Sequence, residues 1–335
     1  MDRLVELFSS SLSDASLFTS DGVFCALIDA LALPMALRHA CPGPKAARPG
    51  ASWRTAVKLF LLAAKAGLAA VESLDAAVGD AALADIWTHV FAALESCLLF
   101  GASGVGVGAA SVLVGDDNDE DEVFEISVVT TVRAEILPLL HRAPARVQSH
   151  AVAFFRSGVY FGDGGDVLAS PTSASSRLPP PREKLAAACL ESLYFLASKA
   201  ATNGLAAGSV KHSVYAALAV HAGDAVMQHA AAVLQEYVLL RAQSGALPLP
   251  RIKQGEVALV LGEALRLDLH PAALSTADGA NARIAALPYA NRHLFLLYPH
   301  MVNCLLVADR PVLSQLQAAL RKIGSEMGLD GAACI

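Results

Sequence analysis

Residues 226–240 read VMQHAAAVLQEYVLL, and residues 244–251 read SGALPLPR. Apolar side chains recur in the first stretch every three or four residues, which is the spacing of one face of an α-helix. These positions are Val226, Ala230, Val233, Leu234, Tyr237 and Leu240. Gly245 suits the end of that helix, and Pro248 and Pro250 make the next segment a rigid connection that is not helical. The pattern predicts a long amphipathic helix, a fixed turn and a second helix that begins near Arg251.

The same periodicity extends outward in both directions. Toward the C-terminus it predicts a helix from Arg251 and a last helix capped by Asp309, with Pro311 in its first turn. Their apolar faces comprise Val257, Val260, Leu261 and Leu265 in the first, and Leu313, Leu316, Leu320, Ile323 and Met327 in the second. Toward the N-terminus the periodic positions are Leu185, Cys189, Leu193 and Leu196, then Leu83, Ile86, Val90, Leu94 and Cys97, and then a helix over Trp53–Glu72.

Composition favours packing of these helices against each other. Hydrophobic residues make up 55% of the 335-residue chain and aromatic residues only 6%, so the apolar content is mainly Ala, Leu and Val. Ala and Leu have high helix propensity, and Ala lets helix axes approach closely. We therefore predict an all-α fold, an armadillo/HEAT-like solenoid of stacked antiparallel helices. This prediction rests on architecture, because no repeat of fixed period is found.

Two long breaks divide the chain. One is rich in glycine and then acidic, and the other is rich in serine and proline. Val123–Val132 is rich in β-branched residues, but helix-forming residues follow it, so we predict a helix there. The expected organisation is a helical region 1–100, a Gly-rich then acidic loop 101–122, a helical region 123–161, a Ser/Pro-rich loop 162–181 and a C-terminal helical region 182–328.

Charge and cysteine usage exclude several classes of protein. The net charge is -6, and no Lys or Arg lies between Ala66 and Val132, where twelve acids occur. Neither that stretch nor the remainder has the dense basic stripe of a nucleic-acid-binding protein. The six cysteines are far apart and form no metal-ligand pattern, which predicts a reduced, cytoplasmic compartment. The uncharged run Cys97–Gly115 contains five glycines, so we expect a loop and no transmembrane segment.

The sequence contains no motif that predicts a catalytic, cofactor-binding or metal-binding residue. The run Gly101–Gly108 suggests a dinucleotide loop, but the GxGxxG spacing fails at Ala109 and at Ser111. An NAD(P)-dependent oxidoreductase is therefore a remote alternative. The acidic run Asp116–Glu122 lacks the order of a calcium-binding loop, so we interpret it as solvated. The dispersed histidines, such as His89 and His150, are assigned to surface or packing roles.

Three ordered segments resemble the C-terminal region of the Mon-two family. The first is an Arg-Glu pair followed by a helix with Cys189. The second is Tyr237, a polar link and then Leu-Pro-Arg with a following Glu and Val-Leu. The third is a Leu-Tyr-Pro sequence and an Ala-Leu helix at the C-terminal end. Together they cover about residues 181–325. BIG-type Arf guanine-nucleotide exchange factors also end with a Tyr-Pro and a Leu-rich helix, so the regulatory end of such a factor is the alternative.

The resemblance implies a Sec7-related, non-catalytic scaffold of vesicle-mediated transport, cytoplasmic and peripheral at Golgi and endosome membranes. It also implies Dopey-like partners, a flippase and Arf-like GTPases. Because the chain is far shorter than members of that family, we expect a fragment or an internal start at Met1. Our candidates for partner contact are Pro248, Pro250 and Arg251, since a fixed turn presents an arginine to a partner. The alternative role for them is that of a structural linker.

Overall fold

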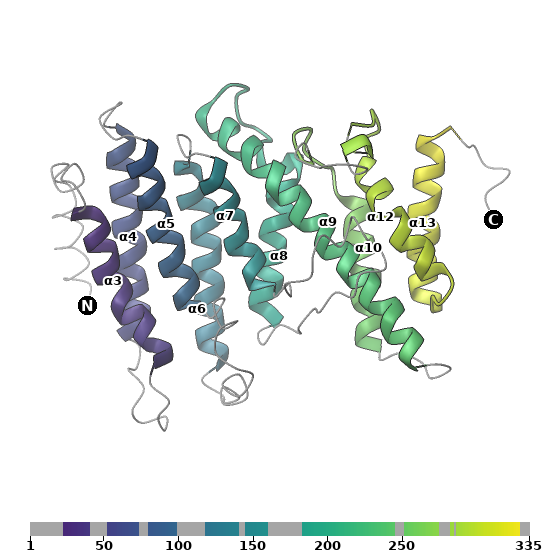
Figure 1. Cartoon of the computed structure of the whole chain (residues 1–335), viewed down its shortest axis with the longest axis horizontal. Helices are drawn as coiled ribbons and strands as arrows, with labels where there is room; N and C mark the ends of the chain where they lie inside the picture. The colour runs from purple at the N-terminus through teal and green to yellow at the C-terminus, as the bar shows by residue number, and fades with distance from the viewer. Residues whose placement is uncertain are drawn as a thin grey trace. The chain divides into compact units, whose positions relative to one another are not determined.

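The structure is a computed structural model, and it describes residues 23–40, 52–73, 80–98, 118–140, 145–159, 183–244, 251–274, 282–284 and 286–328. Within those ranges the chain folds into helices without any β-strand (Figure 1). The predicted fold class, an all-α solenoid of stacked helices, is confirmed. The chain divides into two compact units. Unit 1 holds the described residues up to Val159 with 183–192 and 206–214, and unit 2 holds 193–205 and those from Tyr215 onward.

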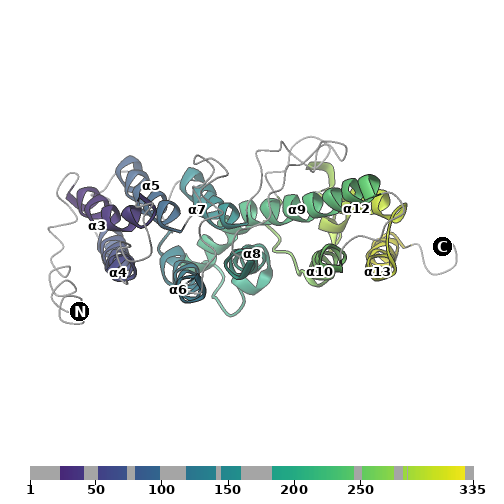
Figure 2. The same ribbon diagram turned by 90° about the horizontal axis from the view of Figure 1, so that it is seen from below.

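Unit 1 packs its helices in two layers. Helix α3 contacts both α4 and α5, and α5 contacts α7. Seen from below, α3, α5 and α7 lie in one layer, while α4 and α6 lie in the other (Figure 2). The helices of this unit are α3 (Val23–Ala40), α4 (Ser52–Ser73), α5 (Asp80–Cys97), α6 (Asn118–Thr131), α7 (Ala145–Gly158) and the first part of α8 (Glu183–Ala197).

Aromatic side chains fill the core of unit 1 between α5 and α7. The Trp87 ring stacks on Phe91 with 5.6 Å between centroids, and Phe91 contacts Phe154 at 6.0 Å. All three are buried, as are the α5 residues that the periodicity assigned to one face. Burial of such large apolar surfaces is the main favourable term in folding of this unit.

Polar pairs join neighbouring helices at the edges of that core. His89 Nδ1 lies 2.8 Å from Asp29 Oδ1, which joins α5 to α3. His150 Nε2 lies 3.5 Å from Glu95 Oε1, which joins α7 to α5. Burial raises the pKa of the Glu95 carboxyl, and His150 partly opposes this. Both histidines therefore contact neighbouring helices, in accordance with the packing roles expected for them.

Helix α6 begins earlier than the sequence predicted. The acidic loop was expected to extend to Glu122, whereas α6 begins at Asn118 and Glu122 is buried in it. Its carboxylate is satisfied by the backbone of α8, described below. The predicted helix over Val123–Val132 is confirmed. Beyond it the chain continues as a π-turn, Val132–Ile136, and a 3₁₀ turn, Leu137–Leu139. Pro138 accounts for this change, because proline cannot donate the hydrogen bond of a regular helix.

Unit 2 is organised around the long helix that residues 226–240 predict. Helix α9 (Val210–Ser244) buries Val226, Ala230, Val233, Leu234 and Tyr237. It is followed by α10 (Arg251–Arg266), α12 (Arg292–Leu305) and α13 (Arg310–Glu326). Helix α10 packs on α12 and α13, and these two pack on each other. The helices predicted from Arg251 and after Asp309 are thereby confirmed.

Candidate protein-interaction surface

The three residues predicted to contact a partner lie where the structure gives no contacts. Pro248 and Pro250 fall outside the described residues. Arg251 is the first residue of α10, and its side chain is also outside the described set. Their role as partner contacts therefore stays a prediction, and so does the alternative role as a linker.

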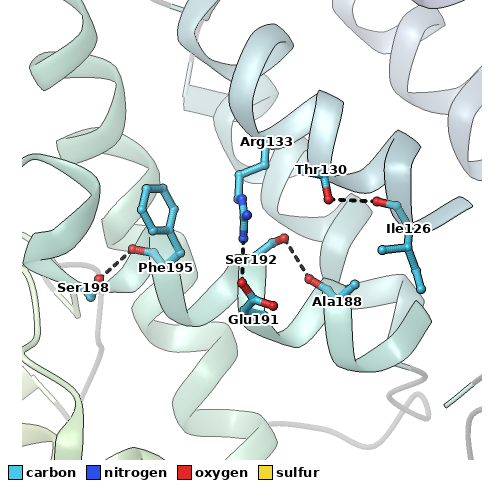
Figure 3. A network of polar contacts seen from close by, with 8 residues as sticks. All are labelled: Ile126, Thr130, Arg133, Ala188, Glu191, Ser192, Phe195 and Ser198. Carbon is cyan, nitrogen blue, oxygen red and sulfur yellow. Dashed lines mark hydrogen bonds and ion pairs between the residues drawn. The ribbon is translucent and has the colours of Figure 1, made fainter. Parts of the chain in front are cut away.

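Several polar side chains on and beside α8 are engaged within the fold, although the buried Tyr194 hydroxyl has no hydrogen-bond partner among the described residues. Within α8 the Ser192 hydroxyl donates to the carbonyl oxygen of Ala188, and Ser198, just after the helix, donates to that of Phe195 (Figure 3). Arg133 reaches Glu191 at 3.5 Å, and Glu191 is 75% exposed. An ion pair with such exposure contributes little, because water screens it.

The opposite end of α8 is held by a carboxylate from α6. Glu122 Oε1 accepts hydrogen bonds from the backbone N–H groups of Lys184 at 3.0 Å and Leu185 at 3.1 Å. The first N–H groups of a helix have no partner inside it, and a negative charge there is also favoured by the helix dipole. Glu122 is thus a capping residue of α8. Nearby, burial and then Glu125 raise the pKa of the Cys189 thiol, which stays protonated.

Among the described α-helices, α12 differs in having no charged residue after its first one, Arg292. From His293 to Ala308 the sequence contains no Asp, Glu, Lys or Arg. One side of the helix is buried, including Leu297, His300, Met301 and Cys304. The other side presents Tyr298, Val302 and Leu306, which are 47%, 37% and 86% exposed. They recur at every fourth position and so lie along one face. We name these three residues the α12 stripe.

The start of α12 and helix α13 are each fixed to the end of α10 by a side-chain donor, which is buried for His293 and half-buried for Lys322. His293 Nε2 lies 2.8 Å from the carbonyl oxygen of Ala264, and Lys322 Nζ lies 2.6 Å from that of Leu265. These carbonyls belong to the last turn of α10, where the helix itself supplies no donor. His293 and Lys322 therefore cap α10 and fix α12 and α13 beside it.

The His293 ring is neutral in this position. Burial lowers its pKa to about 4, and the hydrogen bond to Ala264 opposes that shift only in part. A carbonyl oxygen can only accept, so Nε2 carries the proton and donates it. This neutral donor avoids placing an uncompensated charge in the core.

The end of α12 is fixed to α9. Cys304 Sγ donates to the carbonyl oxygen of Leu234 at 3.5 Å, and burial raises the thiol pKa to about 12. Just beyond, the Tyr237 hydroxyl donates to Asp309 Oδ2 at 3.0 Å. Asp309 precedes α13 as predicted, but its side chain makes no capping bond to that helix. Its carboxylate binds Tyr237 instead. With both ends held, the α12 stripe is displayed on a rigid element.

Leu297, Tyr298 and Pro299 form the Leu-Tyr-Pro sequence of the family resemblance, and that resemblance does not indicate a surface. Leu297 is buried, whereas Tyr298 and Pro299 are exposed. A signal was present: after Arg292 at its start α12 has no charged residue, so apolar side chains lie on both of its sides. One side packs internally, and the other must face outward.

Two further kinds of feature were sought in the parts of the chain that the structure describes. Among those residues no group of three or more His, Cys, Asp or Glu side chains is arranged to hold a metal ion. None of the helices described is long and apolar enough to cross a membrane. Most of the glycine-rich run considered for a dinucleotide or a membrane segment lies outside the described residues.

Comparison with known families extends the resemblance over nearly the whole chain. A family model for the C-terminal region of Mon2 protein matches residues 1–327. The match thus includes the first 180 residues, for which the sequence patterns supplied no resemblance. No curated protein and no solved structure matches the chain.

Proposed function

Since the chain belongs to the family defined by the C-terminal region of Mon2 protein, we propose that it is a non-catalytic scaffold in vesicle-mediated protein transport between Golgi and endosomes. The family match over residues 1–327 is the observation that carries this proposal. In this proposal the protein is cytoplasmic and binds Golgi and endosome membranes peripherally through its partners.

The architecture supports a binding role. Stacked helices present broad surfaces made from side chains of successive elements, and such folds serve as platforms for other proteins. The α12 stripe is an apolar surface of this kind, held at both ends by α9 and α10. Apolar patches on an otherwise folded surface are typical of protein contact sites.

The partners in this proposal are a Dopey-like protein, an Arf-like GTPase and a flippase. They come from the family resemblance alone. Pro248, Pro250 and Arg251 remain the proposed contact residues in the connection before α10, where two prolines would limit the conformations of the segment.

Co-precipitation from cells of the source organism tests the proposal. The tagged full chain should enrich the Dopey-like protein over an unrelated helical solenoid of similar size, and it should co-localise with a Golgi or endosome marker. Arg251→Glu should weaken enrichment if the connection before α10 is a contact. Equal recovery on the chain and on the control solenoid, with diffuse staining in cells, would contradict the scaffold role.

A further inference from the structure

The α12 stripe combines large apolar exposure with a fixed backbone. Leu306 is 86% exposed at the end of the helix, and Tyr298 and Val302 continue the row. Toward the other end, Phe295 is covered by Tyr289, whose ring stacks on it at 5.3 Å between centroids. The row spans two helical turns, about 12 Å, which is the length over which two crossing helices interdigitate.

The charges of the segment that carries this row are unbalanced. In residues 286–328 the cations are Arg292, Arg310, Arg321 and Lys322, and the anions are Asp309 and Glu326. Both anions already bind groups of unit 2, Asp309 to Tyr237 and Glu326 to the Asn291 amide. Arg310 and Arg321 are exposed on α13, and neither forms an ion pair with an acid among the described residues. Arg310 follows Leu306 by four residues, at the turn between α12 and α13, so a cation borders the stripe.

Two other occupants fit these observations less well. An isologous dimer would bring this same patch against itself, and the patch has arginines but no unengaged acid to meet them. A bilayer-inserting surface has bulky side chains that project beyond the rest of the protein. Tyr298 and Val302 are less than half exposed, so of the three residues only Leu306 projects from the surface.

We infer that the α12 stripe docks an acidic amphipathic helix of a partner protein. Apolar side chains of that helix would cover Tyr298, Val302 and Leu306, and its flanking carboxylates would face Arg310. Such helices bind apolar surfaces through anchors spaced three or four residues apart. This inference rests on the proposed scaffold function and names the site and the chemistry of the partner.

A synthetic peptide tests the inference with the purified full chain. The probe is a fluorescein-labelled helix of about 18 residues with leucines along one face and glutamates elsewhere. A second peptide replaces every glutamate by lysine. Anisotropy should show binding of the acidic peptide, weakened about tenfold by Leu306→Asp and at least about tenfold weaker for the lysine peptide. Arg310→Glu should reduce this preference for the acidic peptide.

Leu33→Asp is the matched control, because Leu33 is an exposed leucine of α3 in unit 1, 63% exposed. It should leave peptide binding unchanged, and both variants should keep the thermal midpoint of the wild type. Failure of the acidic peptide to bind, equal binding of the lysine peptide, or an equal loss in Leu33→Asp would overturn the inference.

The same variants identify the competing occupants. Self-association in sedimentation that is lost in Leu306→Asp would assign the stripe to a second copy and overturn the inference. Co-sedimentation with phosphatidylserine vesicles that is lost in Leu306→Asp would assign it to a membrane, with the same result. Failure here is distinct from failure of the scaffold proposal, since co-precipitation of the Dopey-like protein by the wild-type chain does not depend on the peptide.

Discussion

Tyr237 on α9 and Asp309 ahead of α13 form a reciprocal pair. The Tyr237 hydroxyl donates to Asp309 Oδ2 at 3.0 Å. The oxygen of that hydroxyl also accepts a hydrogen bond from the backbone N–H of Asp309, at 3.0 Å. Arg241 Nη2 lies 3.8 Å from the second carboxylate oxygen. One phenol thereby satisfies two groups of the turn that joins α12 to α13.

Removing that hydroxyl should loosen the turn. Tyr237→Phe leaves the Asp309 N–H and one carboxylate oxygen without their partner, so the free energy of unfolding should fall by about 1–3 kcal/mol. Urea denaturation followed by circular dichroism measures the loss. Tyr298→Phe is the control, because Tyr298 is 47% exposed on α12. Equal stability of the two variants would show that the pair contributes nothing.

Glu122 should stabilise the start of α8 although it lies on another helix, α6. Glu122→Ala removes the acceptor of two N–H groups and should cost about 1–3 kcal/mol of unfolding free energy. Glu122→Gln keeps an acceptor oxygen and should cost less. Glu191→Ala, which removes the exposed partner of Arg133, should stay within about 0.5 kcal/mol of the wild type. Chemical denaturation ranks the three, and a different order would refute the capping role.

Local periodicity was sufficient to predict the helices. The row from Val226 to Tyr237 is buried as expected, although Ala231, Ala232 and Gln235 are buried too, so this part of α9 is enclosed on more than the predicted face. The helix after Asp309 begins where a proline in the first turn allows it. These features depend on residues within a few positions of each other, and so a single sequence contains them.

Features that depend on distant residues were not predictable in this way. Glu122 lies in an acidic run that reads as solvated, and the N–H groups that bind it belong to Lys184 and Leu185. Asp309 has the local pattern of a helix cap, yet Tyr237 from α9 binds its carboxylate. Exposure of the α12 stripe likewise depends on how α10 and α13 cover the other side of α12. Contacts of Pro248, Pro250 and Arg251 stay predictions.

The burial of His293 predicts that the folded chain loses stability in acid. Its pKa is lowered from an ordinary value of 6.5 to about 4 in the folded chain, so the unfolded chain binds the proton more readily. The contribution of the neutral ring to the free energy of unfolding is therefore fully present above pH 6.5. It is lost as the pH falls from 6.5 through about 4, and the total loss is about 3 kcal/mol.

The His293→Gln variant isolates this effect, because glutamine can donate to Ala264 but does not titrate. Unfolding free energies measured between pH 7 and pH 4 should decline less steeply for the variant than for the wild type. Other titrating groups are common to both proteins, so the difference in slope reports His293. Parallel curves would show that the ring is not held neutral.

Two glycines in helix interiors should respond in opposite directions to alanine. A Cβ on Gly223 of α9 would lie 2.8 Å from Ala273 Cβ, closer than side-chain carbons approach, whereas a Cβ on Gly255 of α10 meets nothing within 4 Å. Gly223→Ala should therefore lower the unfolding free energy by about 1–2 kcal/mol, since overpacking outweighs the gain in helix propensity. Gly255→Ala should raise it by about 0.5–1 kcal/mol.

The steric origin can be separated from a backbone effect by a double substitution. Ala273→Gly removes the atom that the new Cβ would strike, so Gly223→Ala combined with Ala273→Gly should be less destabilised than the sum of the two single variants. The difference in a double-mutant cycle is the interaction energy of the two Cβ atoms. Strict additivity would locate the cost of Gly223→Ala in α9 itself, and the close approach of Ala273 to α9 would then have no energetic consequence.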